Sequence, residues 1–119
     1  MTSLNNLPLF KPVKTKKKIS SLFDFGKKIT SPIITLYYLN GPLDNNTFYF
    51  GVSVSKKLIK SAVTRNYIKR LMRLALRSSF YNSPKKFYNI NCVILIYNYP
   101  SPTNLNTLSK SIISLVPND

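Results

Sequence analysis

The chain has no histidine and no glutamate, and its only carboxylate side chains are Asp24, Asp44 and Asp119. These residue types supply most general acids and bases in enzymes, and histidine is the commonest metal ligand. Nucleophilic catalysis would need a base beside a Ser, Cys or Lys, and a two-metal nuclease would need several convergent carboxylates. The sequence therefore predicts no catalytic residue and no metal ligand in the protein itself.

Cysteine, glycine and long apolar runs are also scarce. The single Cys92 excludes an internal disulfide and a cysteine zinc site, which favours a reducing compartment. Its apolar surroundings in the sequence indicate a small buried side chain with no further role. The 3 glycines form no phosphate-binding loop, so no small-molecule substrate is expected. No apolar run reaches the ~18 residues of a membrane span, and no signal peptide is recognisable. A soluble, cytoplasmic protein is expected.

Positive charge is what the chain has in excess. Its 18 Lys and Arg residues against 3 acidic ones give a net charge of +15 on 119 residues. Between Asp44 and Asp119 there is no acidic residue, although 11 of the 18 basic residues lie in that stretch. Ordinary surfaces mix the two signs, and a field of one sign is usually neutralised by a polyanion. Nucleic acid is the favoured partner, and the alternatives are an anionic membrane or a charge that only maintains solubility.

The length supports one domain. Residues 1–15 are expected to form a basic, flexible arm, in which Pro8 and Pro12 discourage regular structure and a lysine cluster begins at Lys14. Residues 16–119 are expected to form a single α/β domain. The boundary is placed where helical periodicity begins.

Hydrophobic periodicity and turn residues predict the elements of that domain. They are a helix over about 16–25, strands over 33–39 and 47–54, a helix over about 61–78, a strand over 92–97 and a last helix. The first two strands flank Asn and Gly turn residues and are expected to pair as an antiparallel hairpin. Ser101 is expected to cap the last helix, with Pro102 at its first position. The predicted fold is an α+β sandwich with a small mixed four-stranded sheet covered by helices.

The segment 61–78 has the strongest pattern in the chain. Its apolar residues recur at the spacing of an amphipathic helix, and they are Ile68, Leu71, Met72, Ala75 and Leu76. The opposite side carries Asn66 among basic residues, which are Arg65, Lys69, Arg70, Arg73 and Arg77. Such a helix can enter a DNA groove, dock on folded RNA or lie on a membrane. The core needs the apolar face, which argues against a membrane, and a preceding strand favours RNA over DNA.

Residues 51–77 read GVSVSKKLIKSAVTRNYIKRLMRLALR. This segment resembles, without gaps, the signature of the bacterial ribonuclease P protein subunit. That signature is G-hydrophobic-S-V-S-K-K, a short linker, A-V-x-R-N-R-x-K-R and two hydrophobic residues before Arg. Upstream, residues 23–26 and 33–39 are similar to that family's first helix, which ends in F-x-x-G, and to its first strand, which has an L-Y pair. The resemblance covers about residues 14–97 clearly, and the last helix by pattern.

In that family the protein is the accessory subunit of an endoribonuclease. A catalytic RNA uses Mg²⁺ to remove the 5′ leader from precursor tRNA. The resemblance therefore implies an enzyme subunit without catalytic residues, one protein per catalytic RNA, and Mg²⁺ bound mainly by the RNA. It also implies a left-handed crossover between parallel strands near Val54 and Cys92, against the usual right-handed rule. The alternative is a ribosomal or architectural RNA-binding protein with no role in cleavage.

The resemblance further implies two sets of RNA-binding residues. The catalytic RNA would contact Lys56, Lys57, Arg65, Asn66, Lys69, Arg70 and Arg73. The single-stranded leader of precursor tRNA would lie between the first helix and the sheet, against Ile19, Phe23 and Tyr37. An exposed aromatic ring can stack on any unpaired base, whereas the pattern alone favours core packing for Phe23.

Three positions depart from the family pattern. Tyr67 replaces the second Arg of R-N-R, Ile59 stands where Gly is usual, and Ser31-Pro32 occupies a place where a basic residue is common. At Tyr67 we expect an ionic contact to be lost or replaced by stacking. We expect Ile59 to alter the turn before the basic helix, and Ser31-Pro32 to weaken the contact of the sheet with RNA.

Overall fold

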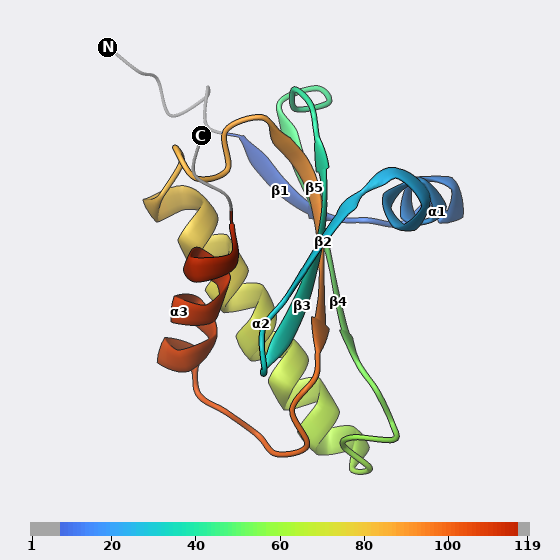
Figure 1. The fold of residues 1–119 in the computed structure, drawn as a ribbon, viewed down its shortest axis with the longest axis vertical. Helices are drawn as coiled ribbons and strands as arrows, with labels where there is room; N and C mark the ends of the chain where they lie inside the picture. Colours follow the sequence, from blue (N-terminus) through green and yellow to red (C-terminus); the bar gives the residue numbers. More distant parts are fainter. Residues whose placement is uncertain (1–7, 117–119) are drawn as a thin grey trace.

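The computed structural model describes residues 8–116, which fold as a five-stranded mixed sheet with helices on both faces (Figure 1). The elements are β1 (Leu9–Pro12), α1 (Lys16–Phe25), β2 (Lys27–Thr30), β3 (Ile34–Asn40), β4 (Thr47–Val54), α2 (Ala62–Asn82), β5 (Ile90–Tyr97) and α3 (Leu105–Leu115). The strand order across the sheet is β1-β4-β5-β3-β2. The predicted α+β sandwich is confirmed, although the sheet has one strand more than the four predicted.

The edge strand β1 lies in the segment for which the sequence predicts no regular structure. It pairs parallel to β4, with Pro12 opposite Phe50, and the Phe10 ring stacks on the Phe50 ring at 4.2 Å between centroids. An edge strand tolerates proline because one side of its backbone has no neighbouring strand. The expectation that prolines discourage regular structure here is therefore wrong for residues 9–12, whereas Pro8 lies before the strand and outside regular structure. The rest of the predicted arm up to residue 7 lies outside the described residues.

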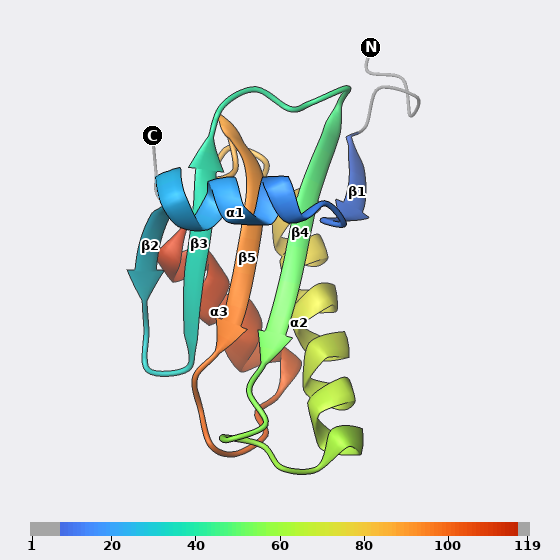
Figure 2. The ribbon, with the colours of Figure 1, turned by 90° about the vertical axis from the view of Figure 1, so that its right-hand side faces the viewer.

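The predicted hairpin is also wrong, because β5 lies between β3 and β4. β5 is antiparallel to β3 and parallel to β4, with Val54 opposite Tyr97. Strands that are buried on both faces take the centre of a sheet, and six of the eight residues of β5 are buried. The turn residues at 41–46 therefore carry the chain over the end of β5, as Figure 2 shows.

The helix α2 connects β4 to the parallel strand β5. In Figure 2 both strands point downwards, β5 lies to the left of β4, and α2 runs behind the sheet. This arrangement makes the crossover left-handed, as the family resemblance implies and against the usual preference. The side chain of Ser61 caps α2 by accepting a hydrogen bond from the Thr64 N–H at 3.2 Å, so the helix begins close to its predicted position.

Asn104, rather than the predicted Ser101, caps α3. Its side-chain oxygen accepts a hydrogen bond from the Thr107 N–H at 2.8 Å, which satisfies a free donor of the first turn. Ser101 has a different role, because its carbonyl accepts a hydrogen bond from the buried Tyr97 hydroxyl. Burial raises the pKa of Tyr97 above its ordinary value, so the hydroxyl keeps the proton that it donates. This local contact with the end of β5 therefore holds Ser101 before the helix.

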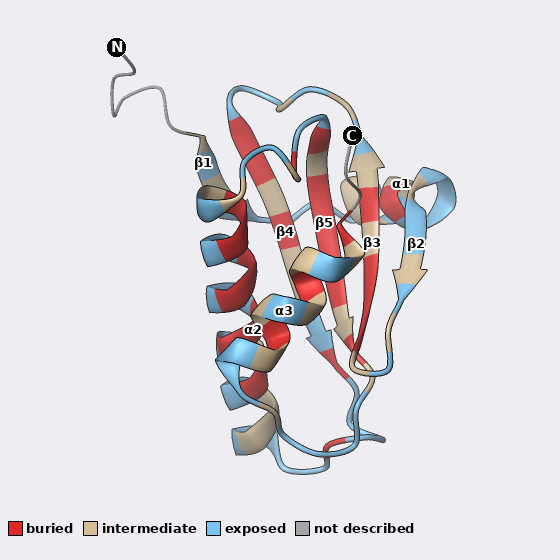
Figure 3. Ribbon diagram, turned by 60° about the vertical axis from the view of Figure 1, so that its left-hand side comes forward, coloured by how far each residue is buried: buried red, intermediate tan, exposed pale blue. Residues whose placement is uncertain are grey.

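The helices cover the two faces of the sheet unequally (Figure 3). On one face α2 and α3 enclose the main core. Its fully buried side chains include Phe48, Ile68, Met72, Leu95, Tyr97 and Leu108. Of the described helices, α1 alone crosses the other face (Figure 2), where Leu22, Cys92 and Ile94 form a small separate cluster. We call these the closed face and the open face.

Candidate nucleic-acid interface

The helix α1 crosses the open face, and a hydrogen bond defines each of its two ends. Thr15 caps it, accepting a hydrogen bond from the Lys18 N–H at 3.3 Å. Gly26 ends it, donating its N–H to the Leu22 carbonyl at 2.8 Å. A Cβ at Gly26 would collide with that carbonyl oxygen, so the close approach requires glycine. Leu22 is buried against the sheet with Cys92 and Ile94, and the apolar residues around this cluster, among them Tyr37 and Ile96, stay partly exposed.

A hollow of about 320 Å³ opens beside α1. We call it the α1 hollow. Its walls are mainly apolar, with Ile19 and Phe23 from α1 and Ile94 and Ile96 from β5. Its floor includes Gly51 of β4, where a Cβ would lie 3.3 Å from Ile94 Cγ1. Because Gly51 has no side chain, the hollow extends down to the backbone of β4 at this position. The hollow can therefore receive a flat apolar group.

Two of the three residues to which the resemblance assigns the leader line this hollow, and the third, Tyr37, contacts one of them. Ile19 and Phe23 line it, and the Tyr37 ring lies edge-on to the Phe23 ring with 4.8 Å between centroids. Phe23 is 46% exposed, so it is not a core residue, contrary to what the pattern alone favours. The Lys28 amine lies 5.8 Å from the centre of the Tyr37 ring. The exposed Phe23 ring and the partly buried Tyr37 ring beside a cation suit the bases and phosphates of a single strand.

A second, larger hollow of about 560 Å³ lies at the start of α1. We call it the lysine hollow, because Lys11, Lys14 and Lys18 line it, together with Tyr49 and Asp44. The Lys18 amine is 3.8 Å from the Asp44 carboxylate and 3.8 Å from the centre of the Tyr49 ring. The sequence shows the lysine cluster but not this site. The missing information is the pairing of β1 with β4, which brings Lys11 beside Tyr49.

The helix α2 presents its basic residues opposite its core residues, as the periodicity predicts. Asn66, Arg70, Arg73 and Arg77 are exposed, while Arg65 and Lys69 are partly buried. The sequence contains no acidic residue anywhere in α2. Lys56 and Lys57 are exposed in the loop between β4 and α2. That loop follows β4, whose residue Ser53 lines the α1 hollow, so the chain runs from one predicted RNA-binding surface to the other within a few residues.

Arg65 differs from the other basic residues of this helix. Its guanidinium donates hydrogen bonds to the carbonyls of Ile59 and Lys60, at 2.9 and 2.8 Å. It therefore stabilises the loop that carries Lys56 and Lys57. Ile59 has no positive φ and its side chain is buried in the core. The turn at this position therefore accommodates a residue other than glycine without strain.

The departure at Ser31-Pro32 also has a structural explanation. The Ser31 hydroxyl accepts hydrogen bonds from the N–H groups of Ile33 and Ile34, at 3.3 and 3.1 Å. It therefore closes the turn between β2 and β3, a hairpin that the sequence does not predict. Lys28 of β2 faces Tyr37 across this hairpin, which leaves a cation beside the α1 hollow.

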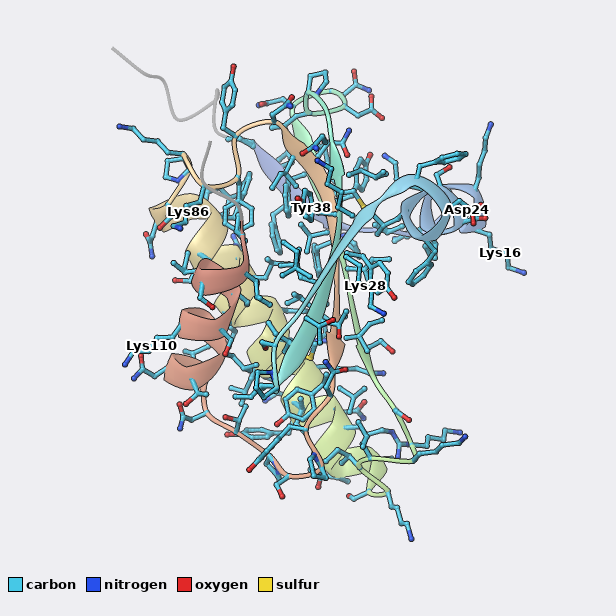
Figure 4. All side chains as sticks on the ribbon, viewed as in Figure 1. Lys16, Asp24, Lys28, Tyr38, Lys86 and Lys110 are labelled. Carbon is cyan, nitrogen blue, oxygen red and sulfur yellow. The ribbon has the colours of Figure 1, made fainter. Side chains whose placement is uncertain are left out.

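Positive charge alone does not single out one surface. Figure 4 shows Lys86 and Lys110 on the side of α2 and α3, and Lys16 and Lys28 on the side of α1. What distinguishes the α1 hollow is its apolar lining, which includes the exposed Phe23 ring, with the Lys28 amine close by at Tyr37. Within residues 8–116 there is no group of three or more His, Cys, Asp or Glu side chains that could hold a metal ion. No helix in the same range has the length and apolarity to cross a membrane.

Comparison with known proteins identifies the family. Residues 7–116 match the family model described as Ribonuclease P. A Mesoplasma florum protein named ribonuclease P protein component is 32% identical over 110 residues, covering 87% of this chain and 96% of that protein. Proteins of the same name are 35% identical over 65 residues in Syntrophomonas wolfei and 41% over 66 residues in Streptococcus agalactiae. The chain spans about half the length of these two relatives, 52% and 58%.

Solved structures show the same fold. The ribonuclease P protein from Thermotoga maritima superposes with a TM-score of 0.66 at 15% identity, covering 88% of this chain and 94% of that one. A Staphylococcus aureus ribonuclease P protein gives 0.61 at 20% identity, covering 87% and 90%. The family model and the Mesoplasma relative extend over most of the chain. The chain therefore belongs to the ribonuclease P protein family.

Proposed function

We propose that this chain is the protein subunit of ribonuclease P, which binds a catalytic RNA and assists the removal of the 5′ leader from precursor tRNA. The observation that carries the proposal is the α1 hollow, which Ile19 and Phe23 line and where the Tyr37 ring packs edge-on against Phe23. Family membership supports it. An exposed ring such as Phe23, with a cation such as Lys28 nearby, is typical of proteins that bind single-stranded nucleic acid without regard to sequence.

The leader is the ligand of the α1 hollow in this proposal. One unpaired base stacks against Phe23 and Tyr37, with the Lys28 amine near the adjacent phosphate. Stacking on an aromatic side chain contributes roughly 1–3 kcal/mol per base. Such contacts tolerate every base, so one subunit can bind the leaders of many precursors.

The catalytic RNA is the ligand of α2 and of the loop before it. Lys56, Lys57, Lys69, Arg70 and Arg73 neutralise its phosphates, and Asn66 donates or accepts a hydrogen bond among them. Arg65 has a positioning role as well, because it stabilises the loop that carries Lys56 and Lys57. One protein binds each catalytic RNA.

The described residues do not fit a magnesium site, because hard cations prefer several convergent oxygens and no such acidic group is formed. Asp24 lies on α1 and Asp44 in the turn before β4. In this proposal Mg²⁺ belongs to the RNA, and the chain binds and orients the leader. Its cations reduce the repulsion between leader and RNA phosphates, so cleavage needs less Mg²⁺ when the protein is present.

Reconstitution with the catalytic RNA of the same organism tests the proposal. Adding the protein is expected to lower the Mg²⁺ or salt concentration required for cleavage of precursor tRNA. No effect at low Mg²⁺ would contradict the proposal. The variant Arg70→Gln is expected to weaken the effect, while Lys110→Gln on α3 serves as the matched control, because it removes the same charge from another side of the molecule.

Isolation of the protein from its own cells distinguishes the proposed function from the alternative. Co-purification of a catalytic RNA and precursor tRNA supports the proposal. Ribosomal RNA as the main partner would favour a ribosomal or architectural protein with no role in cleavage. The α1 hollow favours the first outcome, because such a protein needs no groove for a passing single strand.

A further inference from the structure

The outward side of α2 carries apolar side chains that the core does not use. Val63 is 80% exposed, Tyr67 50% and Leu74 49%. At about 100° per residue these positions project within about 40° of one another. One exposed apolar residue is ordinary on a protein surface. Three exposed apolar residues in one line on a highly charged helix indicate an interaction surface.

Two arginines share this line. Arg70 lies between Tyr67 and Leu74, and Arg77 follows Leu74 one turn later. Both are exposed. We call these five residues, Val63, Tyr67, Arg70, Leu74 and Arg77, the outer stripe. It extends over about 21 Å at 1.5 Å per residue. Apolar and cationic side chains therefore lie interspersed along one side of the helix.

We infer that the outer stripe binds unpaired bases of the catalytic RNA, while its arginines bind the flanking phosphates. The inference rests on the proposed function, because it names the RNA feature that α2 contacts. Base-paired RNA offers mainly phosphates and ribose hydroxyls to a helix, whereas unpaired bases offer apolar rings. Tyr67 stacks on one such base, and Val63 and Leu74 cover the edges of its neighbours. Tyr67 also stands where the family pattern has arginine, so this contact is a property of the present chain.

The charges argue for RNA as the occupant. A second copy packed through the outer stripe would bring two sets of Arg70 and Arg77 into one interface, with no acidic residue on either helix to pair with them. The net charge of +15 adds a general repulsion between copies. A polyanion with exposed bases satisfies both kinds of side chain at once.

Binding to the isolated catalytic RNA at several salt concentrations tests the inference. Tyr67→Ala is expected to weaken binding about fivefold to a hundredfold, the equivalent of one lost stack. The slope of affinity against salt stays unchanged because no charge is removed. Tyr67→Phe retains the ring and binds like the wild type. Leu74→Ala shows a smaller loss with the same slope. Arg70→Gln lowers the slope by somewhat less than one.

Tyr88→Ala is the matched control, because Tyr88 is 72% exposed in the loop after α2. It is expected to leave both affinity and slope unchanged. If Tyr67→Ala and Leu74→Ala behave like this control while Arg70→Gln lowers the slope, the outer stripe inference is wrong and the proposed function stands. If the wild type does not bind the catalytic RNA at all, the proposed function itself fails.

Acylation of the ribose 2′-hydroxyls, which modifies unpaired nucleotides, identifies the bases that the outer stripe contacts. In the wild-type complex a few unpaired nucleotides are expected to become unreactive, and Tyr67→Ala is expected to restore their reactivity at a concentration that saturates the RNA. Protection confined to base-paired segments would overturn the inference. So would self-association of the free protein, seen by sedimentation, that Tyr67→Ala and Leu74→Ala abolish, since the occupant would then be a second copy.

Discussion

The two faces of the sheet use aromatic side chains in opposite ways. On the closed face, Phe48 packs against Phe80 and Phe87 with centroid distances of 4.3 and 5.7 Å, and all three rings are buried. On the open face, Phe23 meets Tyr37 and remains 46% exposed. The closed face uses its rings for stability, whereas the open face keeps rings available for a ligand.

The difference follows from the helices that cover each face. The closed face lies under helices of 21 and 11 residues, and the open face under one of 10 residues. The shorter cover leaves the α1 hollow and the lysine hollow at its sides. An exposed ring contributes less to folding than a buried one. The sites with least packing are therefore the sites at which binding is expected.

The largest expected effect is on the closed face. Phe48→Ala is expected to lower the free energy of unfolding by about 3–5 kcal/mol, because it leaves a large cavity among rings that cannot collapse. Leu22→Ala, in the small cluster under α1, is expected to cost less, about 2–3 kcal/mol. Urea unfolding measures both, with Phe23→Ala as a nearly neutral control. Equal losses for Phe48→Ala and Leu22→Ala would contradict the contrast between the faces.

The next effect tests how well α1 shields the open face. Burial raises the pKa of the Cys92 thiol from 9.0 to about 11, against a smaller opposing effect of the Lys18 ammonium. A raised pKa means that the folded state holds the proton more tightly than the unfolded chain. The thiol therefore stabilises the fold fully below pH 9, and this contribution is lost as the pH rises from 9.0 to about 11.

The expected loss is on the order of 2–3 kcal/mol over that range, at about 1.4 kcal/mol per pH unit. Urea unfolding between pH 8 and 11.5 measures it. Cys92→Ala is the control, because its lysines titrate as in the wild type while the thiol is missing. Parallel pH profiles for the two proteins would show that Cys92 is accessible to water beneath α1.

Local patterns predict the helices well but not the neighbours of the strands. The limits of α1 match the prediction, because Thr15 and Gly26 are local signals. The hairpin prediction fails because the most apolar strand, β5, comes late in the sequence and still takes the centre of the sheet. The turn residues at 41–46 would be the same whether they joined two adjacent strands or passed over a third strand between them. Which of the two occurs depends on which strand buries most apolar surface at the centre of the sheet.

The candidate site shows the same limit. The basic side of α2 is predictable from periodicity, because one helix contains all of it. The α1 hollow is not, because its walls come from α1, β4 and β5. The resemblance names Ile19, Phe23 and Tyr37, but their exposure depends on how much of the open face α1 leaves uncovered. The lysine hollow is missed because it depends on β1, a strand of four residues ending in proline.

A smaller effect concerns binding at the open face. Phe23→Leu retains an apolar side chain but removes the ring, so the affinity for precursor tRNA is expected to fall by about 1 kcal/mol, at the lower end of a lost stack. The affinity for mature tRNA, which has no leader, is expected to remain unchanged. Binding of the reconstituted enzyme to both RNAs measures the difference, and Tyr88→Ala controls for a lost exposed ring. Equal losses for the two RNAs would count against the leader assignment.

The smallest expected effect is at the lysine hollow, where Asp44 opposes the lysines of the open face. The ion pair with Lys18 spans 3.8 Å, and the Asp44 side chain is 64% exposed. Exposed pairs of this kind contribute at most about 1 kcal/mol, so Asp44→Asn is expected to leave stability almost unchanged. Removing one negative charge about 10 Å from an RNA phosphate favours binding by about 0.4 kcal/mol, or roughly twofold.

That gain is expected only at low ionic strength, because salt screens exposed charges over about 10 Å at 0.1 M. Asp24→Asn is the matched control. It removes the same charge from α1 but does not line the lysine hollow. Titrations of precursor tRNA at low and high salt measure both variants. An equal gain for Asp24→Asn would attribute the effect to net charge, whereas a gain confined to Asp44→Asn means that the RNA passes the lysine hollow on its way along the open face.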